Sequence, residues 1–329
     1  MTAKPQVLLI DAGGTIASVP DGRGVLVGRA GSAGLAAALP PVPYTLVERQ
    51  AYAGLSEDMG FADALRIIDL AATAEGDTGL TGTVVAHGTD TMEDVAFLTD
   101  LFHGGAKPVV FTGAQRAPGA PGSDGMANLL DALAVAADPA SRGIGSVIVF
   151  GGRILPAPHA LKLDSSGPEA FGPHSAAIGR VDDRGMQLEL LPRRRPAFAR
   201  VQPDATVAVA SLALGSTGKL IDLLVDGGAR GIVVQGFGRG NVPAAVLFAM
   251  QRAKAAGVLL GIATHCIGGG TAPSYASGAA LADLGAVPAG LLSARKLRLL
   301  LAVALGDGRD AAEAGRLAQG WLAPPPLTR

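Results

Sequence analysis

The stretch Val84-Val85-Ala86-His87-Gly88-Thr89-Asp90-Thr91-Met92-Glu93-Asp94 decides both the fold and the candidate site of this chain. Its apolar beginning predicts a buried β-strand, and the residues after Gly88 are typical of a helix start. A hydroxyl beside a carboxylate, Thr89-Asp90, is the pairing expected for activating a nucleophile or holding an ammonium group. The alternative is a helix N-cap, in which Asp90 accepts a backbone N–H and Glu93 completes a capping box.

A second strand-to-turn junction lies upstream, at Val7-Leu8-Leu9-Ile10-Asp11-Ala12-Gly13-Gly14-Thr15-Ile16-Ala17-Ser18. The diglycine Gly13-Gly14 permits unusual backbone angles and lets N–H groups approach a small ligand, as in an oxyanion hole. The alternative is an ordinary tight turn. The dinucleotide pattern is absent from this turn and no P-loop occurs, so a phosphate site is not indicated. For Asp11 we expect a buried carboxylate that bonds turn amides, although it is also a candidate acid or base.

Outward from these two stretches, short apolar runs alternate with Ala- and Leu-rich helical patterns. Strands are expected at residues 6–11, 44–48, 82–87, 108–112 and 145–150, and helices at 32–39, 60–74, 91–103 and 124–137. Apolar strands separated by helices predict a parallel sheet covered on both faces, the doubly wound α/β class. Ligands of such sheets bind beyond the carboxyl ends of the strands, which is where Ala12, His87 and Gly113 stand.

The character of the chain changes over residues 151–200, which are rich in Gly, Pro and polar residues. We expect an N-terminal α/β domain over 1–190, a linker over 191–205 with a solvated run Arg193-Arg194-Arg195, and a smaller C-terminal α/β domain over 206–329. The predicted elements of the C-terminal domain are strands at 206–212, 231–235 and 259–264 and helices at 217–226, 243–256 and 293–305.

Composition narrows the function classes. With 27 Lys and Arg against 28 Asp and Glu, the formal net charge of −1 gives no electrostatic case for nucleic acid or an anionic membrane. The single Cys266 excludes an internal disulfide, and no apolar stretch reaches the roughly 18 residues of a spanning helix. The beginning of the chain lacks a signal-peptide pattern, so we expect a cytoplasmic protein. The five His show no metal-binding spacing, and neither a metal nor a cofactor is expected.

Lys162 and the pair His265-Cys266 each allow two interpretations. Lys162 lies in the irregular region; most lysines are solvated, but one near Thr89 and Asp90 could lower the pKa of the hydroxyl and relay a proton. His265-Cys266 could suggest a nucleophile and its base. Adjacent residues on a strand point to opposite faces, so we expect these two side chains not to meet.

Several segments, in order and spacing, resemble the bacterial-type L-asparaginase/glutaminase family. Gly13-Gly14-Thr15-Ile16-Ala17 resembles its first signature, and His87–Glu93 resembles the second nearly residue for residue. Five more matching segments are Leu55-Ser56-Glu57-Asp58-Met59, Lys107-Pro108-Val109-Val110, Gly113-Ala114-Gln115-Arg116, Ser123–Leu129 and Gly236–Asn241. The resemblance spans nearly the whole chain. It implies a metal-free enzyme with a large N-terminal and a smaller C-terminal α/β domain, assembled as a homotetramer of intimate dimers with its active sites at the subunit interface.

Carried over by position, the resemblance assigns roles to individual residues. Ser56 would hold the α-carboxylate of a small amino-acid-like substrate, and Glu57 with Asp90 its α-amino group. Thr89, Asp90 and Lys162 would form one catalytic triad. The remaining substrate-binding positions implied by the family are Gly13, Thr15, Gly88 and, from the neighbouring subunit, Asn241.

The other triad of the family is missing. Ala12 stands at the position of the nucleophilic Thr, Val25 at that of a loop Tyr, and the segment 272–284, where a Glu from the neighbouring subunit is expected near Ala279 or Ala280, contains no Glu. A methyl group cannot attack a carbonyl, so the acyl-enzyme route through this position is closed. Either Ala12 is an engineered Thr→Ala knock-out, or the chain has diverged; the absence of all three members favours divergence.

The leading hypothesis is an asparaginase-like amidohydrolase that hydrolyses the side-chain amide of a small amino-acid-like substrate through Thr89, Asp90 and Lys162. Thr89 could attack the amide itself or position a water. The first rival is an inactive protein that binds aspartate or asparagine on the same fold. The second is a non-hydrolytic enzyme, an isomerase or lyase with Lys162 as its base.

Overall fold

The structure is a computed structural model that describes residues 4–14, 16, 18–20, 26–28 and 34–324. The chain divides into two compact units, residues 1–197 and 198–329. The division falls inside the tract 191–205. Part of this tract is fixed to the N-terminal unit, because the Arg194 guanidinium donates to the carbonyl oxygens of His103 and Gly105. The prediction that the arginine run is solvated is therefore wrong for Arg194.

The N-terminal unit is built on a mixed sheet, ordered β12-β11-β8-β7-β6-β5-β1-β4 among the described residues. Its neighbouring parallel strands are β4 (Thr45–Gln50), β1 (Gln6–Ala12), β5 (Leu80–His87), β6 (Val109–Thr112) and β7 (Ser146–Phe150). The antiparallel strands β8 (Arg153–Pro156), β11 (Gly179–Asp182) and β12 (Gly185–Leu188) extend it at one edge. Two short antiparallel pairs stand apart: β2 (Ser18–Pro20) with β3 (Leu26–Gly28), and β9 (Leu161–Lys162) with β10 (Phe171–Gly172).

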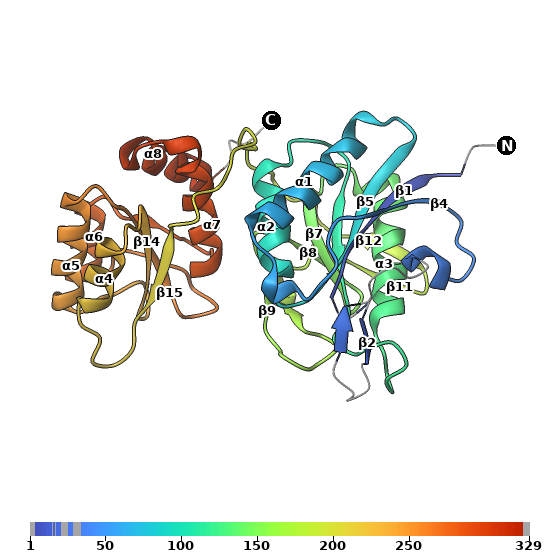
Figure 1. Ribbon diagram of the computed structural model, residues 1–329, viewed down its shortest axis with the longest axis horizontal. Coiled ribbons are helices and arrows are strands. Elements are labelled where there is room, and N and C mark those ends of the chain that lie inside the picture. Colours follow the sequence, from blue (N-terminus) through green and yellow to red (C-terminus); the bar gives the residue numbers. More distant parts are fainter. Residues whose placement is uncertain (1–3, 15, 17, 21–25, 29–33, 325–329) are drawn as a thin grey trace. The chain divides into compact units, whose positions relative to one another are not determined.

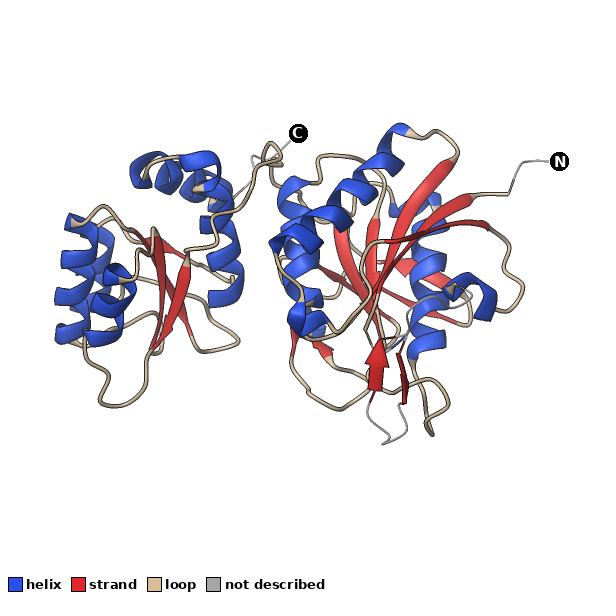
Figure 2. Ribbon diagram, viewed as in Figure 1, coloured by secondary structure: helices blue, strands red, loops and turns tan. Residues whose placement is uncertain are grey.

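Helices cover both faces of this sheet, as Figures 1 and 2 show. Helices α1 (Phe61–Gly76) and α2 (Met92–Phe102) lie on one face and α3 (Gly125–Ala137) on the other. The core under α3 contains Val7, Leu9, Val84 and Ala86, alternate residues of β1 and β5. The intervening residues, such as Ile10 and Val85, are equally buried. Burial of every residue along a central strand is typical of a doubly wound sheet, which confirms the predicted fold class.

Two predictions for this unit are wrong. The helix expected over 32–39 is only a 3₁₀ turn, Leu35–Ala38, and residues 32 and 33 lie outside the described part of the chain. Pro40 and Pro41 follow directly, and the residue before a proline is disfavoured in helical conformation. The region 151–200 was expected to be irregular, but its first part holds the antiparallel strands, which are four residues or shorter and therefore leave little periodic signal.

The C-terminal unit carries a parallel sheet ordered β13-β14-β15-β16. These strands are Ala208–Ser211, Gly231–Gly236, Leu259–Thr264 and Val287–Pro288. Its helices are α4 (Lys219–Asp226), α5 (Ala244–Ala255), α6 (Ala276–Asp283), α7 (Ala294–Ala304) and α8 (Ala311–Leu322). Helices α4 to α6 lie on one face and α7 with α8 on the other (Figure 1). Helices α6 and α8 and strand β16 were not among the predicted elements, although Asp310 caps α8 by accepting the N–H of Glu313.

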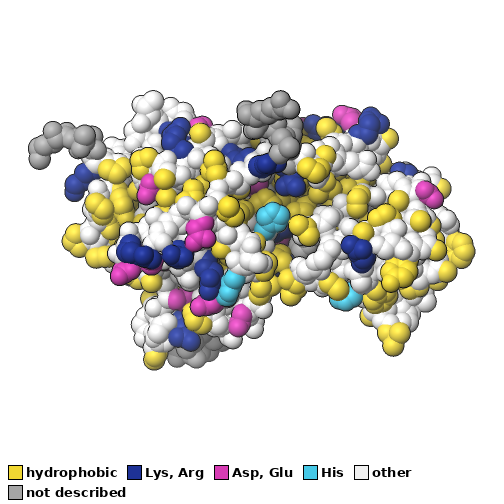
Figure 3. All heavy atoms as spheres, turned by 180° about the vertical axis from the view of Figure 1, so that it is seen from behind, with side chains coloured by type: hydrophobic (Ala, Val, Ile, Leu, Met, Phe, Trp, Pro, Cys, Tyr) yellow, Lys and Arg dark blue, Asp and Glu magenta, His cyan; other side chains and the backbone are white. Residues whose placement is uncertain are grey.

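The surface charges and the lengths of the helices give two further facts about the molecule. On the face that Figure 3 displays, acidic and basic side chains are interspersed rather than separated into blocks of one sign. Within the described ranges, every helix is too short or too polar to cross a membrane.

Candidate active site

The two signature stretches, around Ala12 and around Gly88, meet at the carboxyl edge of the N-terminal sheet. Strand β1 pairs in parallel with β5, and the register places Ala12 beside His87. The turns that follow, Gly13-Gly14 and Gly88-Thr89, therefore leave the sheet side by side. This is the edge at which open α/β sheets bind ligands.

Glycines join these two turns closely. Gly14 has φ +82°, and a Cβ built on it would lie 2.3 Å from the Cα of Gly88. A Cβ on Gly88 would lie 2.5 Å from the Oγ of Ser56, and one on Gly13 would lie 2.5 Å from the carbonyl oxygen of Gly54. No side chain larger than hydrogen fits at the three positions without movement of backbone or of Ser56. The diglycine is therefore a packing joint between the two signature turns.

The backbone amides of the diglycine are already paired. Gly13 N–H donates to Asp11 Oδ1 at 2.9 Å, and Gly14 N–H donates to the carbonyl oxygen of Gly54 at 3.1 Å. The tight-turn interpretation is thus correct, and the oxyanion-hole interpretation is wrong for this arrangement. The expectation that Asp11 bonds a turn amide is confirmed, although the residue is half-buried rather than buried. Its burial raises the pKa of the carboxyl group, and the hydrogen bond from Gly13 opposes that effect.

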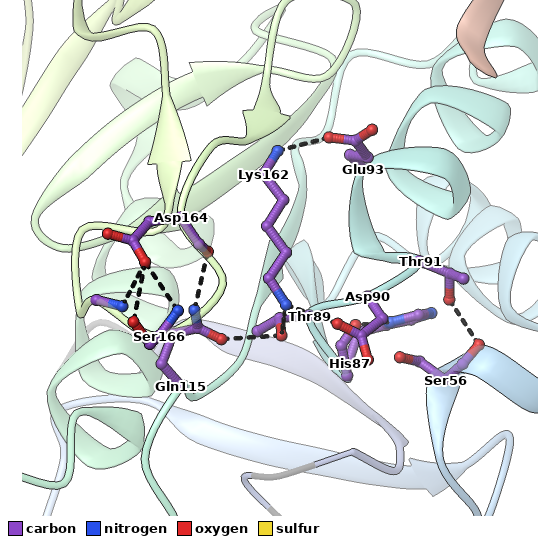
Figure 4. A network of polar contacts seen from close by, with 12 residues as sticks. Ser56, His87, Thr89, Asp90, Thr91, Glu93, Gln115, Lys162, Asp164 and Ser166 are labelled. Carbon is purple, nitrogen blue, oxygen red and sulfur yellow. Dashed lines mark hydrogen bonds and ion pairs between the residues drawn. The ribbon is translucent and has the colours of Figure 1, made fainter. Parts of the chain in front are cut away.

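Lys162 brings the catalytic candidates together (Figure 4). Its Nζ lies 2.8 Å from Thr89 Oγ1 and 2.6 Å from Asp90 Oδ1. Lys162 sits on the short strand β9, whose position is fixed by α2, because the buried Glu93 carboxylate accepts the backbone N–H of Lys162 at 2.6 Å. The Lys162 side chain is 16% exposed and that of Asp90 is 58% exposed. A buried hydroxyl, an ammonium group and a carboxylate open to solvent thus form one contiguous cluster.

The capping interpretation, with Asp90 as the N-cap, is wrong because helix α2 begins one residue later. The N-cap residue of α2 is Thr91, and it makes no side-chain capping bond. Its hydroxyl donates instead to the backbone oxygen of Ser56 at 2.8 Å. Asp90 and Glu93, the two carboxylates of the expected capping box, both accept a hydrogen bond from Lys162.

Gln115 is a member of the cluster that was not predicted as a site residue and entered only as part of a matching segment. Its Oε1 accepts the Thr89 hydroxyl at 3.1 Å, and its Nε2 donates to the carbonyl oxygen of Asp164 at 3.2 Å. A carboxylate, Asp124, accepts the backbone N–H of Gln115 at 3.1 Å and fixes the chain there. The sequence signal that could have identified Gln115 was its position, because it follows β6 at the same sheet edge as Ala12 and His87.

His87 is fully buried beside Phe111. Its Nδ1 donates to the carbonyl oxygen of Gly88 at 2.8 Å, which leaves Nε2 as the unprotonated nitrogen, buried and without a hydrogen-bond partner among the described residues. Burial lowers the pKa of His87 to about 4. The imidazole is therefore neutral at physiological pH, and its bond to the Gly88 carbonyl oxygen holds the turn that precedes Thr89.

The other predicted site residues fall into three groups. Ala12 and Ser56 are buried at the same sheet edge, and Glu57 is exposed in the 3₁₀ turn Ser56–Asp58. Thr15 and Val25 lie outside the described residues. Asn241 belongs to the C-terminal unit, where its backbone oxygen accepts the N–H of Phe237 and its Oδ1 accepts the Ser277 hydroxyl at 3.5 Å.

The prediction for His265 and Cys266 is wrong. Cys266 Sγ lies 3.8 Å from His265 Nε2, and the cysteine is exposed. Strand β15 ends at Thr264, so both residues stand in the bend beyond it, where the alternation of a strand no longer applies.

The C-terminal unit also contains a cavity of about 420 Å³ beside the loop that carries Asn241. Gly240, Ile262, Thr271 and Leu281 are among its mostly apolar lining residues, and Thr89 and Lys162 are not. Among the described residues, no group of His, Cys, Asp or Glu is arranged to hold a metal ion.

Comparisons with known proteins match both units. The family model "Asparaginase, N-terminal" matches residues 6–194, and "Glutaminase/Asparaginase C-terminal domain" matches residues 206–317. A probable L-asparaginase of Deinococcus radiodurans is 36% identical over 314 residues, which cover 92% of this chain and 94% of the relative. An L-asparaginase of Bacillus licheniformis is 31% identical, with coverage of 93% and 97%. A glutaminase-asparaginase of Pseudomonas aeruginosa is 29% identical, with coverage of 94% and 89%. With both of its units matched, the chain belongs to the asparaginase family and is an asparaginase-like amidohydrolase.

Proposed function

We propose that this protein hydrolyses the side-chain amide of a small amino-acid-like substrate through Thr89, Asp90 and Lys162. The observation that carries the proposal is the position of Lys162 Nζ, within 2.8 Å of Thr89 Oγ1 and 2.6 Å of Asp90 Oδ1. A hydroxyl within hydrogen-bond reach of an amine, which a carboxylate in turn orients, is the general arrangement of an activated nucleophile. Ala12, fully buried on the neighbouring strand, contributes only a methyl group.

In the proposed reaction, the Lys162 ammonium group first gives up a proton to solvent. Thr89 Oγ1 then attacks the amide carbon, and its proton passes to the neutral amine of Lys162. When the tetrahedral intermediate collapses, the C–N bond breaks and Lys162 returns the proton to the departing nitrogen, so ammonia leaves. Water then hydrolyses the ester on Thr89, releasing the carboxylic acid and restoring the hydroxyl. Asp90 keeps Lys162 directed at the reacting oxygen throughout.

Substrate binding is proposed from positions as well as contacts. Ser56 lies against Gly88 and is suited to hold the α-carboxylate, while Glu57 and Asp90 offer negative charge to the α-amino group. Gly13, Thr15 and Gly88 would line the pocket, and Asn241 would complete it from a neighbouring subunit of a homo-oligomer, a dimer of intimate dimers. A cytoplasmic location is part of the same proposal; one relative, from Haemophilus influenzae, is named a periplasmic L-asparaginase.

Ammonia release from a panel of asparagine, glutamine and other β- or γ-amides tests the proposal. Thr89→Val keeps the shape of the side chain without the hydroxyl, and we expect it to abolish turnover. Lys162→Met should lower kcat by about 10²- to 10⁴-fold, the usual contribution of a proton-transfer group. Full activity of Thr89→Val would refute the role of Thr89.

The buried Ala12 also favours a second candidate function, an inactive protein that binds aspartate or asparagine. Calorimetry with both amino acids separates the two functions. Tight binding of aspartate with no ammonia from any amide of the panel would replace the hydrolase proposal with this one.

A further inference from the structure

The donors and acceptors of the hydrogen bonds around Thr89 can be assigned in only one consistent way. A backbone carbonyl oxygen can only accept, so the Gln115 atom 3.2 Å from the carbonyl of Asp164 must be the donor Nε2. The other amide atom, Oε1, then faces Thr89 Oγ1 at 3.1 Å and must accept. Thr89 therefore donates its proton to Gln115, and Lys162 Nζ, 2.8 Å away, donates to the Thr89 oxygen.

The far end of this chain of bonds is fixed by its own turn. Asp164 Oδ1 accepts the backbone N–H groups of Ser166 at 2.8 Å and Gly167 at 2.9 Å, and also the Ser166 hydroxyl at 3.2 Å (Figure 4). These bonds hold the pKa of the Asp164 carboxyl below its usual range, and the bond from Gly167 has the largest effect. The turn directs the Asp164 carbonyl toward the Gln115 side chain, and the bond from the Gln115 backbone N–H to Asp124 fixes the backbone of Gln115. The Gln115 amide is thereby prevented from flipping.

This arrangement keeps the Thr89 proton on the side away from its base. An amide oxygen does not take up a proton near neutral pH, so Gln115 cannot activate Thr89. For Thr89 to lose its proton to Lys162, the hydroxyl must turn from Gln115 to Lys162, which must be neutral at that moment. We propose that Gln115 is a positioning residue that holds the Thr89 hydroxyl turned away from Lys162 and so sets the pH at which Thr89 becomes reactive.

The inference rests on the proposed function, in which Thr89 and Lys162 do the chemistry, but its direct test does not need turnover. Among the described residues, the carboxylates bonded to Lys162 are Asp90 at its Nζ and Glu93 at its backbone N–H. The Asp164 carboxylate, two residues further on, is bonded within its own turn. A substitution at Gln115 retains these three carboxylates and removes the bond to the Asp164 carbonyl oxygen. Lys162 can be followed directly by the pH titration of its ε-carbon signal in NMR.

The experiment compares Gln115→Leu and Gln115→Glu with the unsubstituted protein. In Gln115→Leu the Thr89 hydroxyl is free to donate to neutral Lys162, which favours the neutral amine. The titration of Lys162 and the ascending limb of kcat against pH should therefore both move to lower pH. The expected shift is about half to one pH unit, which corresponds to the free energy of one hydrogen bond. In Gln115→Glu the carboxylate keeps the hydroxyl and stabilises the ammonium group, so both should move to higher pH. The new carboxylate raises the titration of Lys162 whatever the role of the glutamine, so the Gln115→Leu shift and its dependence on the Thr89 hydroxyl decide the question.

Two controls complete the test. Gln187→Leu removes another glutamine whose amide is bonded, here to Asp182 at 2.9 Å, and should leave Lys162 unchanged. In a Thr89→Val background, Gln115→Leu should no longer shift the titration, because the effect passes through the hydroxyl. Unchanged titration in both Gln115 variants, shifts in the same direction, or a shift that persists without the hydroxyl would overturn the inference. Activity of Thr89→Val would instead remove the proposed function and leave the Lys162 titration as a separate result.

Discussion

Replacing Gly14 with alanine should separate the two signature turns of the N-terminal unit. The new Cβ would lie 2.3 Å from the Cα of Gly88 and 2.4 Å from its N, both backbone atoms that cannot rotate away. An L-residue at φ +82° costs about 1–2 kcal/mol by itself. Relief of the overlap, by analogy with overpacked cores, costs about 1–3 kcal/mol more. We therefore expect Gly14→Ala to lower the free energy of unfolding by roughly 2–5 kcal/mol.

The same movement of the turns should also lower the rate of the proposed reaction. Gly88 precedes Thr89 directly, and a displacement of about 1 Å in a catalytic group can cost about 10²-fold in rate. Ammonia release should fall accordingly, with a larger effect on kcat than on KM. Thr89 would be misplaced relative to Lys162 on β9, which belongs to a different part of the chain.

Gly119→Ala is the matched control. Gly119 has φ +84°, in the same unit, but its Cβ would meet no atom within 4 Å, so this variant isolates the backbone cost from the overlap. Unfolding should be followed by hydrogen exchange of the β1 and β5 amides. The single tryptophan, Trp321, lies in the C-terminal unit, and its fluorescence serves as an internal reference. If Gly14→Ala matched Gly119→Ala in stability and activity, the joint between the turns would have no energetic importance.

Two further substitutions test the surroundings of the site. Glu93→Gln replaces a charge-assisted bond to the Lys162 N–H with a neutral one. We therefore expect the free energy of unfolding in urea to fall by about 1 kcal/mol, and kcat to fall at unchanged KM. If neither the free energy of unfolding nor kcat changed, Glu93 would not hold β9 in place. Burial raises the pKa of Asp131 to about 6, so its folded form holds the proton more tightly than the unfolded chain does. Its contribution to stability is complete below the unfolded value of 3.8 and is lost as the pH rises through about 6. Asp131→Asn should remove this part of the pH dependence and be relatively more stable at pH 7, and parallel stability–pH curves for the two proteins would contradict the assignment.

Much of the fold was predictable because its signals are local. The apolar runs at β1, β5, β6 and β7 and the helical patterns between them indicate buried strands and covering helices directly, and five parallel strands of the N-terminal sheet were expected within two residues of their observed bounds. The antiparallel strands β8, β11 and β12 escaped because four residues in a Gly- and Pro-containing region carry almost no periodicity. His265 and Cys266 were misjudged for a related reason, since the rule used for them holds only inside a strand.

By itself, the sequence determined which residues stand at the carboxyl edge of the sheet, because strand order along the chain and the turn after each strand are local properties. It placed Ala12, Thr89 and Asp90 at this edge in this way. Only the tertiary structure decided what Thr89-Asp90 does, whether as a helix cap or as a partner of Lys162. Lys162 is 73 residues from Thr89 along the chain, and Gln115 is 26. Hydrogen bonds require donor and acceptor within about 3 Å. No periodicity encodes such a meeting, so the cluster and the direction of the Thr89 proton exist only once the sheet has brought its strand ends together.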